Sequence, residues 1–298
     1  MKKVIFLLAF IMLFTTNVDA KRKKQSSRRG TTTTMKANKA SPMEFSGKAL
    51  EWYNKAKDGD AHAQSELAYC IFYGIGAKKD YEKAFYWASK SCEQGYPLGT
   101  YLTAVCYYSG FGVGIDQSKA QELYTKAHEQ AQPLADNGDA PAQWVMGCLY
   151  YTGNGDVNQD VKTGCNLYKK SANQGYPMSQ IMMAIIYFHG TGVEQDYEQA
   201  ATWCQKAANQ GYAWGQQLLG TCYFEGKGVK QDYNKAINWL SKAADQGHDE
   251  ALFILGDCYL NGEGVKVNKT KAIEYYRKSA RQECVSAQNK LRELGYSW

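Results

Sequence analysis

The sequence predicts an all-α solenoid, in which short helix pairs stack in a row and each pair packs on its neighbours. Two observations lead to this prediction. A Gly-x-Gly turn, followed four to five residues later by Asp or Asn, recurs six times at intervals of 36, 43, 37, 36 and 36 residues. Between the turns, small and apolar residues recur with the spacing of one helix face. The turns begin at Gly74, Gly110, Gly153, Gly190, Gly226 and Gly262.

The first twenty residues have the pattern of a cleaved secretory signal. Lys2 and Lys3 precede an apolar run over 4–14, which is too short to span a bilayer. Val18 and Ala20 then place short side chains before a cut at Lys21. An uncleaved anchor is the alternative, and the shortness of the run argues against it. We therefore expect an exported bacterial protein, periplasmic or secreted.

Residues 21–48 form a basic linker with no apolar period, which we expect to be disordered. The linker holds nine Lys and Arg and one acid, so the net charge of +6 of the whole chain arises here. A solvated arm beside the cleavage site is one interpretation. A weak contact with anionic lipid headgroups or polyanions is the other. For an exported protein we expect no nucleic-acid partner.

The first helix of each repeat is expected to begin just after the Asp or Asn that follows each turn, because Asp and Asn suit a helix N-cap. Counting from this cap, offsets 4, 7, 8 and 11 share one helix face, and they hold small, aromatic or aliphatic residues in each repeat. This face is therefore expected to lie in the core. The caps are Asp80, Asp116, Asp160, Asp196, Asp232 and Asn268.

Glycine then ends the first helix, because it adopts the left-handed conformation at little cost. Pro97, Pro141 and Pro177 follow closely and fit the first turn of a second helix. Counting these units gives about seven helix pairs over 49–298, the last closed by a polar segment. The terminating glycines are Gly95, Gly138, Gly175, Gly211 and Gly247.

Nine cysteines are present, an odd number, and no C-x-x-C spacing occurs, which disfavours zinc and redox motifs. Cys70, Cys106, Cys222 and Cys258 share one position in their repeats, where two other repeats have Leu or Ile. Cysteine that alternates with Leu and Ile behaves as a small core hydrophobe. We expect free buried thiols, although an oxidising compartment would permit some disulfides.

The stretch from Gly226 to Gly247 and on to Tyr259 closely resembles the Sel-1-like repeat, and the resemblance extends from Ala49 to the end of the chain. This resemblance implies tetratricopeptide-like helix pairs stacked into a right-handed superhelix that binds proteins, without family-wide catalytic residues. Some relatives carry a disulfide between cysteines eight positions apart. Cys92 and Cys284 have no partner at that spacing, so this feature does not transfer.

The repeat over 127–138 carries seven extra residues, which predict two added helical turns. The insertion could be a tolerated bulge or a ridge that shapes part of a binding groove. No protease, esterase, penicillin-binding or nucleotide-binding motif occurs in the sequence. The Gly-x-Gly turns lack the third glycine and the preceding strand of a dinucleotide loop. We expect no metal and no cofactor, and His62, His128, His189 and His248 at helix ends or turns.

A binding surface is expected on the first helices, where offsets 6 and 9 from the cap point away from the core and vary between repeats. Ordinary solvent exposure is the alternative. Offset 10 is lysine in six repeats; its stem could cover apolar neighbours, or its charges could bind acidic partners. The predicted partner-binding residues are Tyr86, Ser89, Glu122, Thr125, Asn166, Lys169, Thr202, Gln205, Asn238, Ser241, Glu274 and Arg277.

These features predict an exported, monomeric repeat scaffold that binds a protein or peptide on its concave surface and has no catalysis of its own. One alternative is an envelope hydrolase acting on β-lactams or peptidoglycan fragments, by analogy with some relatives. Another is a structural envelope component tethered by its basic arm. The identity of the partner does not follow from the sequence.

Overall fold

The computed structural model describes residues 45–298, and within them the protein is helical throughout, as predicted. The predicted signal 1–20 and most of the linker lie outside the described residues. The helices are α3 (Gly47–Ala56), α4 (Ala61–Tyr73), α5 (Tyr81–Glu93), α6 (Pro97–Ser109), α7 (Gln117–Asp136), α8 (Ala140–Thr152), α9 (Val161–Asn173), α10 (Pro177–His189), α11 (Tyr197–Asn209), α12 (Ala213–Glu225), α13 (Tyr233–Asp245), α14 (Asp249–Asn261), α15 (Lys269–Arg281) and α16 (Val285–Glu293).

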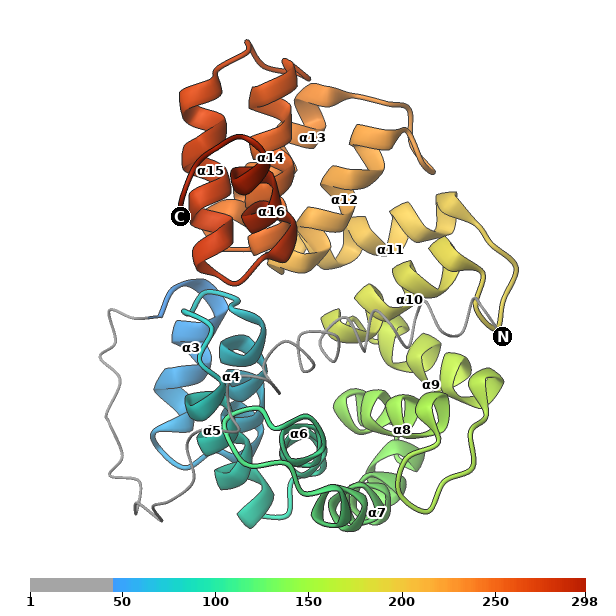
Figure 1. Cartoon of the computed structure of the whole chain (residues 1–298). Helices are drawn as coiled ribbons and strands as arrows, with labels where there is room; N and C mark the ends of the chain where they lie inside the picture. Colours follow the sequence, from blue (N-terminus) through green and yellow to red (C-terminus); the bar gives the residue numbers. More distant parts are fainter. Residues whose placement is uncertain (1–44) are drawn as a thin grey trace.

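The helices form seven antiparallel pairs, from α3–α4 to α15–α16, which confirms the predicted solenoid (Figure 1). We call them repeats one to seven, each with a first and a second helix. The described chain begins just before α3. Phe45 is buried and forms an isolated antiparallel bridge with Ala77. The last residues of the predicted linker therefore pack against repeat one.

The turns between repeats have the predicted geometry. The six cap side chains each accept a hydrogen bond from the backbone N–H three residues on, as Asp80 does from Lys83 at 3.0 Å. Gly74 and its five equivalents lie in the left-handed region, where side chains with a Cβ are strained. Glu283 occupies the glycine position that ends the first helix of repeat seven, with a φ of 67°.

The predicted core face is buried at offsets 4, 8 and 11 in each repeat, whereas offset 7 is only half-buried in four of the six. Offset 4 and offset 11 residues, such as Ala84 and Ser91, are almost fully inaccessible. Where offset 11 is serine, its hydroxyl donates to the first carbonyl of the preceding second helix, as Ser91 does to Ala61 O at 2.7 Å. All nine cysteines are free thiols, and eight are buried. Burial raises the pKa of Cys106 and Cys258 to about 12, which keeps them protonated and inert.

The seven extra residues lengthen α7 to 20 residues, compared with 13 in most of the other helices. Pro133 lies inside this helix and is exposed to solvent. The insertion is therefore a helical extension, as the sequence predicts, and it carries the end of the first helix past its usual position in the repeat.

A ladder of glutamines joins neighbouring repeats. A glutamine at the end of a first helix donates to the side-chain oxygen of a glutamine in the preceding second helix, as Gln94 does to Gln64 at 2.8 Å. The inner glutamine is buried, and in three of the four rungs it donates in turn to a helix-end carbonyl, as Gln64 does to Ala56 O. The other three rungs are Gln174–Gln143, Gln210–Gln180 and Gln246–Gln216.

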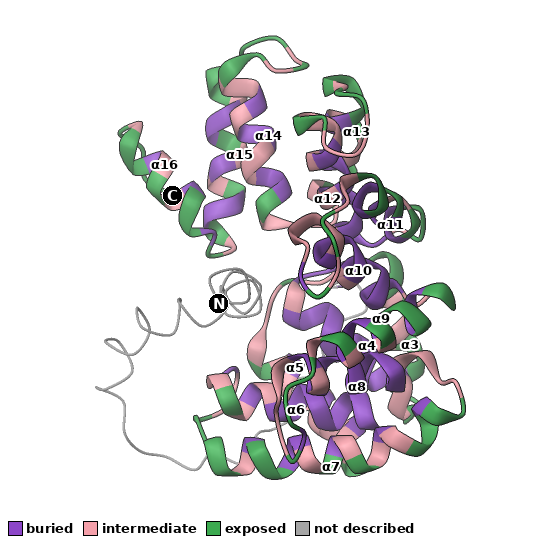
Figure 2. Cartoon of the chain, turned by 90° about the vertical axis from the view of Figure 1, so that its right-hand side faces the viewer, coloured by how far each residue is buried: buried purple, intermediate pink, exposed green. Residues whose placement is uncertain are grey.

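The second helices form the inside of the superhelix and the first helices its outside (Figure 1). Neighbouring second helices touch directly, α4 with α6 and α6 with α8. Figure 2 shows buried residues concentrated on α4, α6, α8 and α10, whereas α7 and α16 are largely exposed or half-buried. The inside is therefore a packed surface, lined with large aromatic side chains.

The superhelix curves until its first repeat meets its later ones. The Tyr69 ring lies 6.3 Å from that of Trp144 in α8, and the Tyr73 ring lies 5.6 Å from that of Trp214 in α12. Lys79, in the turn between α4 and α5, forms an ion pair of 3.3 Å with Asp249 at the start of α14. These contacts join residues up to 170 positions apart and bring the two ends of the solenoid together. Within 45–298, no helix combines the length and the apolar character of a membrane span.

Candidate functional site

The twelve predicted partner-binding residues lie on the first helices, and none of them is buried. They follow the outside of the superhelix from α5 to α15 (Figure 1), while the second helices line its inside. The twelve therefore do not converge on one groove. The six that are exposed are Glu122, Asn166, Lys169, Thr202, Asn238 and Glu274.

Some of the twelve are engaged by the chain itself. Glu122 forms an ion pair of 2.8 Å with Lys119. Arg277 donates its Nε–H to the backbone oxygen of Ser297 at 3.0 Å, and its guanidinium lies 5.9 Å from the Tyr296 ring. The C-terminal tail thus occupies the outer face of α15. Asn166, Lys169 and Asn238 remain as exposed positions on the middle repeats.

In repeats five to seven, the lysine at offset 10 stacks on the aromatic residue three positions before it. Lys206 Nζ lies 4.0 Å from the centre of the Trp203 ring, and Lys242 Nζ lies 4.2 Å from that of Trp239. Such cation–π contacts cover the rings and leave the charge in water. This arrangement agrees with the interpretation that these stems cover apolar neighbours.

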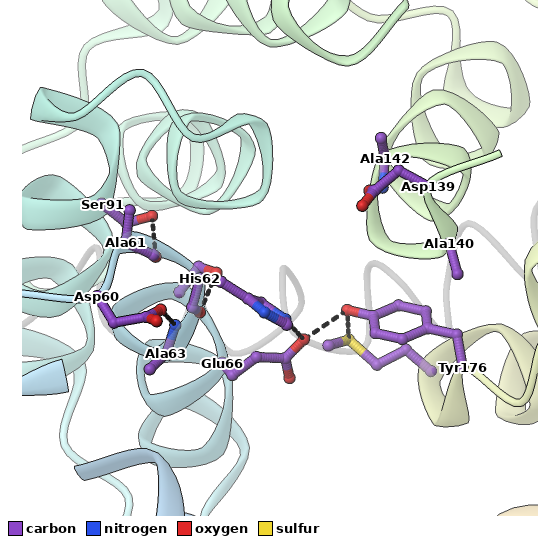
Figure 3. Close-up of polar contacts among 12 residues, drawn as sticks. Asp60, Ala61, His62, Ala63, Glu66, Ser91, Asp139, Ala140, Ala142 and Tyr176 are labelled. Carbon is purple, nitrogen blue, oxygen red and sulfur yellow. Dashed lines mark hydrogen bonds and ion pairs between the residues drawn. The ribbon is translucent and has the colours of Figure 1, made fainter. Parts of the chain in front are cut away.

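A buried carboxylate marks the contact between repeats one and four on the inside (Figure 3). Glu66 of α4 is 2% exposed and accepts a hydrogen bond of 2.9 Å from the hydroxyl of Tyr176, which precedes α10. His62 Nε2 lies 3.3 Å from the same carboxylate oxygen, and this hydrogen bond raises the pKa of His62 above its usual value. Burial raises the pKa of Tyr176, so its hydroxyl stays protonated and donates.

These residues join repeat one to repeat four. In the part of the chain that the structure describes, no group of three His, Cys, Asp or Glu could hold a metal ion. His62 and His189 lie at helix ends and His248 caps α14, as predicted. His128 was expected near an end, but it lies inside α7, because the insertion extends the helix beyond it.

A cleft of about 900 Å³ separates the two ends of the solenoid, and we call it the end cleft. Residues 45–46 and 76–78 of repeat one form one wall. Residues 244–247, at the end of α13 and in the turn after it, form the other wall together with one face of α15. Its charged side chains are Lys78, Lys278, Arg281 and Asp245, all exposed. Three positive charges thus face one negative charge.

Sequence reasoning missed the end cleft and the Glu66–Tyr176 contact. Both depend on how far the superhelix turns over several repeats, which no local pattern encodes. One signal was available in the sequence. Leu252 stands where five other repeats have glutamine, and it lies in the wall of the end cleft.

Comparison with protein families gives one match. The family model described as Sel1 repeat matches seven segments, 46–60, 61–96, 97–131, 140–176, 177–212, 215–248 and 249–284. The longest gap between matched segments, 132–139, lies in the extended end of α7 and the turn after it. No curated protein matches the chain.

Several solved structures are similar. The protective antigen c5321 of uropathogenic Escherichia coli, described as displaying an SLR fold, is 30% identical with a TM-score of 0.52; the match covers 84% of this chain and 59% of that one. This chain therefore spans less than two thirds of the length of that protein. A Sel1 repeat protein from Oxalobacter formigenes is 28% identical with a TM-score of 0.51, covering 83% and 79%.

Proposed function

Since this chain belongs to the Sel1 repeat family, whose members are typically protein-interaction scaffolds, we propose that it binds a protein or peptide partner and carries out no chemistry itself. The observation that supports this most directly is the contrast between a constant frame and variable outer positions. Caps, turns and glutamine rungs repeat in register, while offsets 6 and 9 vary between repeats. Such a frame can hold several distinct side chains in fixed relative positions.

The partner would contact exposed residues of the middle repeats, Asn166, Lys169 and Asn238 among them. The protein would be exported, since residues 1–20 have the composition of a secretory signal. It would act as a monomer.

Photo-crosslinking in envelope extract followed by mass spectrometry tests this function. The wild-type chain is compared with a triple variant, Asn166→Ala, Lys169→Ala and Asn238→Ala. A matched control changes three exposed turn residues instead, Asn158→Ala, Glu194→Ala and Lys230→Ala. We expect one enriched protein that the triple variant loses and the control retains. Equal recovery by all three chains, or no enrichment over beads, would contradict the proposal.

A further inference from the structure

We propose that the end cleft binds an acidic segment of the partner protein, with its carboxylates paired to Lys78, Lys278 and Arg281. This inference rests on the proposed function and adds to it a site and a partner chemistry. The cleft volume of about 900 Å³ lies within the usual range of ligand sites, roughly 300–1,000 Å³. Its walls come from the first repeat and from the last two, so an occupant touches both ends of the solenoid at once.

The charges of the cleft are unbalanced. Among residues 45–298, Lys78, Lys278 and Arg281 form no ion pair. The neighbouring Lys79 differs, because it is 16% exposed and its charge is used by Asp249 in joining the ends. A guanidinium such as that of Arg281 binds carboxylates in a bidentate manner. An acidic occupant therefore supplies the negative charge that the described walls lack.

A second, independent feature lies at the same place. The glutamine ladder breaks in the cleft, because Leu252 replaces the inner glutamine that Gln282 would otherwise bind. In the equivalent rung, Gln246 donates to Gln216 Oε1 and to Gly211 O, both at 2.9 Å. The Gln282 side chain makes no such bond with any described residue, and it lines the cleft. Its amide is free to bind a peptide backbone.

The arrangement favours a peptide over a small anion. All three cationic residues are exposed and come from opposite walls, so one small anion would gain little over water at any of them. A segment with several carboxylates meets them together. The buried Phe45 and Leu252 add apolar surface to the walls, and Gln282 adds an amide that suits main-chain groups.

Fluorescence anisotropy with the full chain tests the proposal. The probe is a short fluorescein-labelled peptide of alternating Glu and Gly; a second probe has Gln in place of Glu. We expect the Glu probe alone to bind, and more weakly as salt rises. The double variant Lys278→Gln/Arg281→Gln is expected to bind it roughly tenfold more weakly. The control Lys170→Gln/Lys206→Gln removes two exposed charges from the same face of earlier repeats and should bind like wild type.

A third variant tests the amide without changing charge. Leu252→Gln restores the rung found in four other repeats, so Gln282 gains a partner and affinity for the Glu probe should fall several-fold. Circular dichroism and melting temperature confirm that each variant is folded. Equal binding of both probes, equal binding by the double variant and wild type, or displacement of the probe by an equal concentration of inorganic phosphate overturns the proposal.

Two further results separate this inference from the proposed function. If crosslinking captures a partner but the double variant retains it and the Glu probe fails to bind, the scaffold function stands and the acidic-segment site is wrong. If wild type dimerises in sedimentation and the double variant does not, the cleft holds a second copy of this chain, which also overturns the proposal.

Discussion

Gln210 and Gln180 hold two successive repeats together through their side chains: Gln210 Nε2 donates to Gln180 Oε1 at 2.9 Å, across the boundary between repeats five and four. Gln210 Nε2 also donates to Gly175 O at 2.9 Å, and Gln180 Nε2 donates to Ala172 O at 3.3 Å. The buried amide of Gln180 thus connects a helix end to the neighbouring repeat, and the exposed amide of Gln210 adds the bond to the turn.

Removing the buried member of this rung should cost more than removing the outer one. We expect Gln180→Ala to lower the free energy of unfolding by about 1–3 kcal/mol, because it removes the partners of two groups. Gln210→Ala should cost about 0.5–1.5 kcal/mol. Urea unfolding measures both, and the double variant gives the coupling. Gln282→Ala is the control and should be nearly neutral, since Gln282 lacks the equivalent rung; a large loss there would contradict the ladder.

Replacing Glu283 with glycine should stabilise the protein. A side chain in the left-handed region costs about 1–2 kcal/mol, partly offset by the greater freedom of glycine in the unfolded chain. We therefore expect Glu283→Gly, where φ is 67°, to raise the free energy of unfolding by up to about 1 kcal/mol. Gly211→Ala makes the reverse change at a φ of 84°, where an added Cβ meets no atom within 4 Å. It should destabilise by a similar amount. A loss of stability in Glu283→Gly would show that the contacts of Glu283 outweigh its strain.

The contact between repeats one and four depends on the Tyr176 hydroxyl. Tyr176→Phe leaves the buried Glu66 carboxylate with His62 as its remaining side-chain partner among the described residues. We expect a loss of about 1–3 kcal/mol in the free energy of unfolding and faster hydrogen exchange in α4. Tyr96→Phe is the control, since the Tyr96 ring stacks on His62 but its hydroxyl donates to no described residue. Equal effects of the two changes would count against a special role for Glu66.

His248 should make the protein sensitive to acid. Its Nδ1 accepts from Ala251 N at 3.4 Å, which requires a neutral ring. Burial lowers the pKa of His248 to about 4, with Asp249 opposing and Lys79 adding to the effect. Between pH 6.5 and pH 4 the unfolded chain binds this proton and the folded chain does not, so stability falls as pH falls.

His248→Asn tests this, because asparagine retains an N-cap acceptor, as Asn268 does in α15. Wild type should lose about 3 kcal/mol relative to this variant as the pH drops from 6.5 to 4. His62 acts in the opposite sense: its raised pKa stabilises at low pH and that stability is lost as pH rises through the folded value. His62 is present in both chains, so its effect cancels in the difference. Parallel pH profiles for the two chains would refute the assignment.

The repeat frame was predictable from the sequence because each of its parts is local. Each feature of the frame depends on residues within about one helical turn: the N-cap, the left-handed glycine and the apolar helix face. The repeat shows each of them six times. The positions of Asp80, Gly95 and Pro97 therefore predict helix ends that the structure confirms. The extra helical turns near residue 130 followed from the same reasoning.

The inside of the superhelix was not predictable in this way. Whether Tyr73 meets Trp214 depends on small rotations that accumulate over three intervening repeats. Glu66 looks in the sequence like an ordinary helical surface acid, and only the approach of Tyr176 buries it. For the same reason, the sequence placed the partner-binding residues on a concave surface, whereas the structure places them on outer helices and fills the inside with second helices.

The Lys79–Asp249 ion pair and the aromatic contacts of α4 close the superhelix on itself, so these contacts form only with the present number of repeats. In an open array, each repeat contacts only its neighbours. Adding or removing one repeat therefore changes the stability of the array by the contribution of that repeat and one interface. Here the first repeat also contacts the third, fourth, fifth and sixth. Deleting or duplicating one repeat would separate the ends, so this protein should unfold as a single cooperative body and tolerate no change in repeat number.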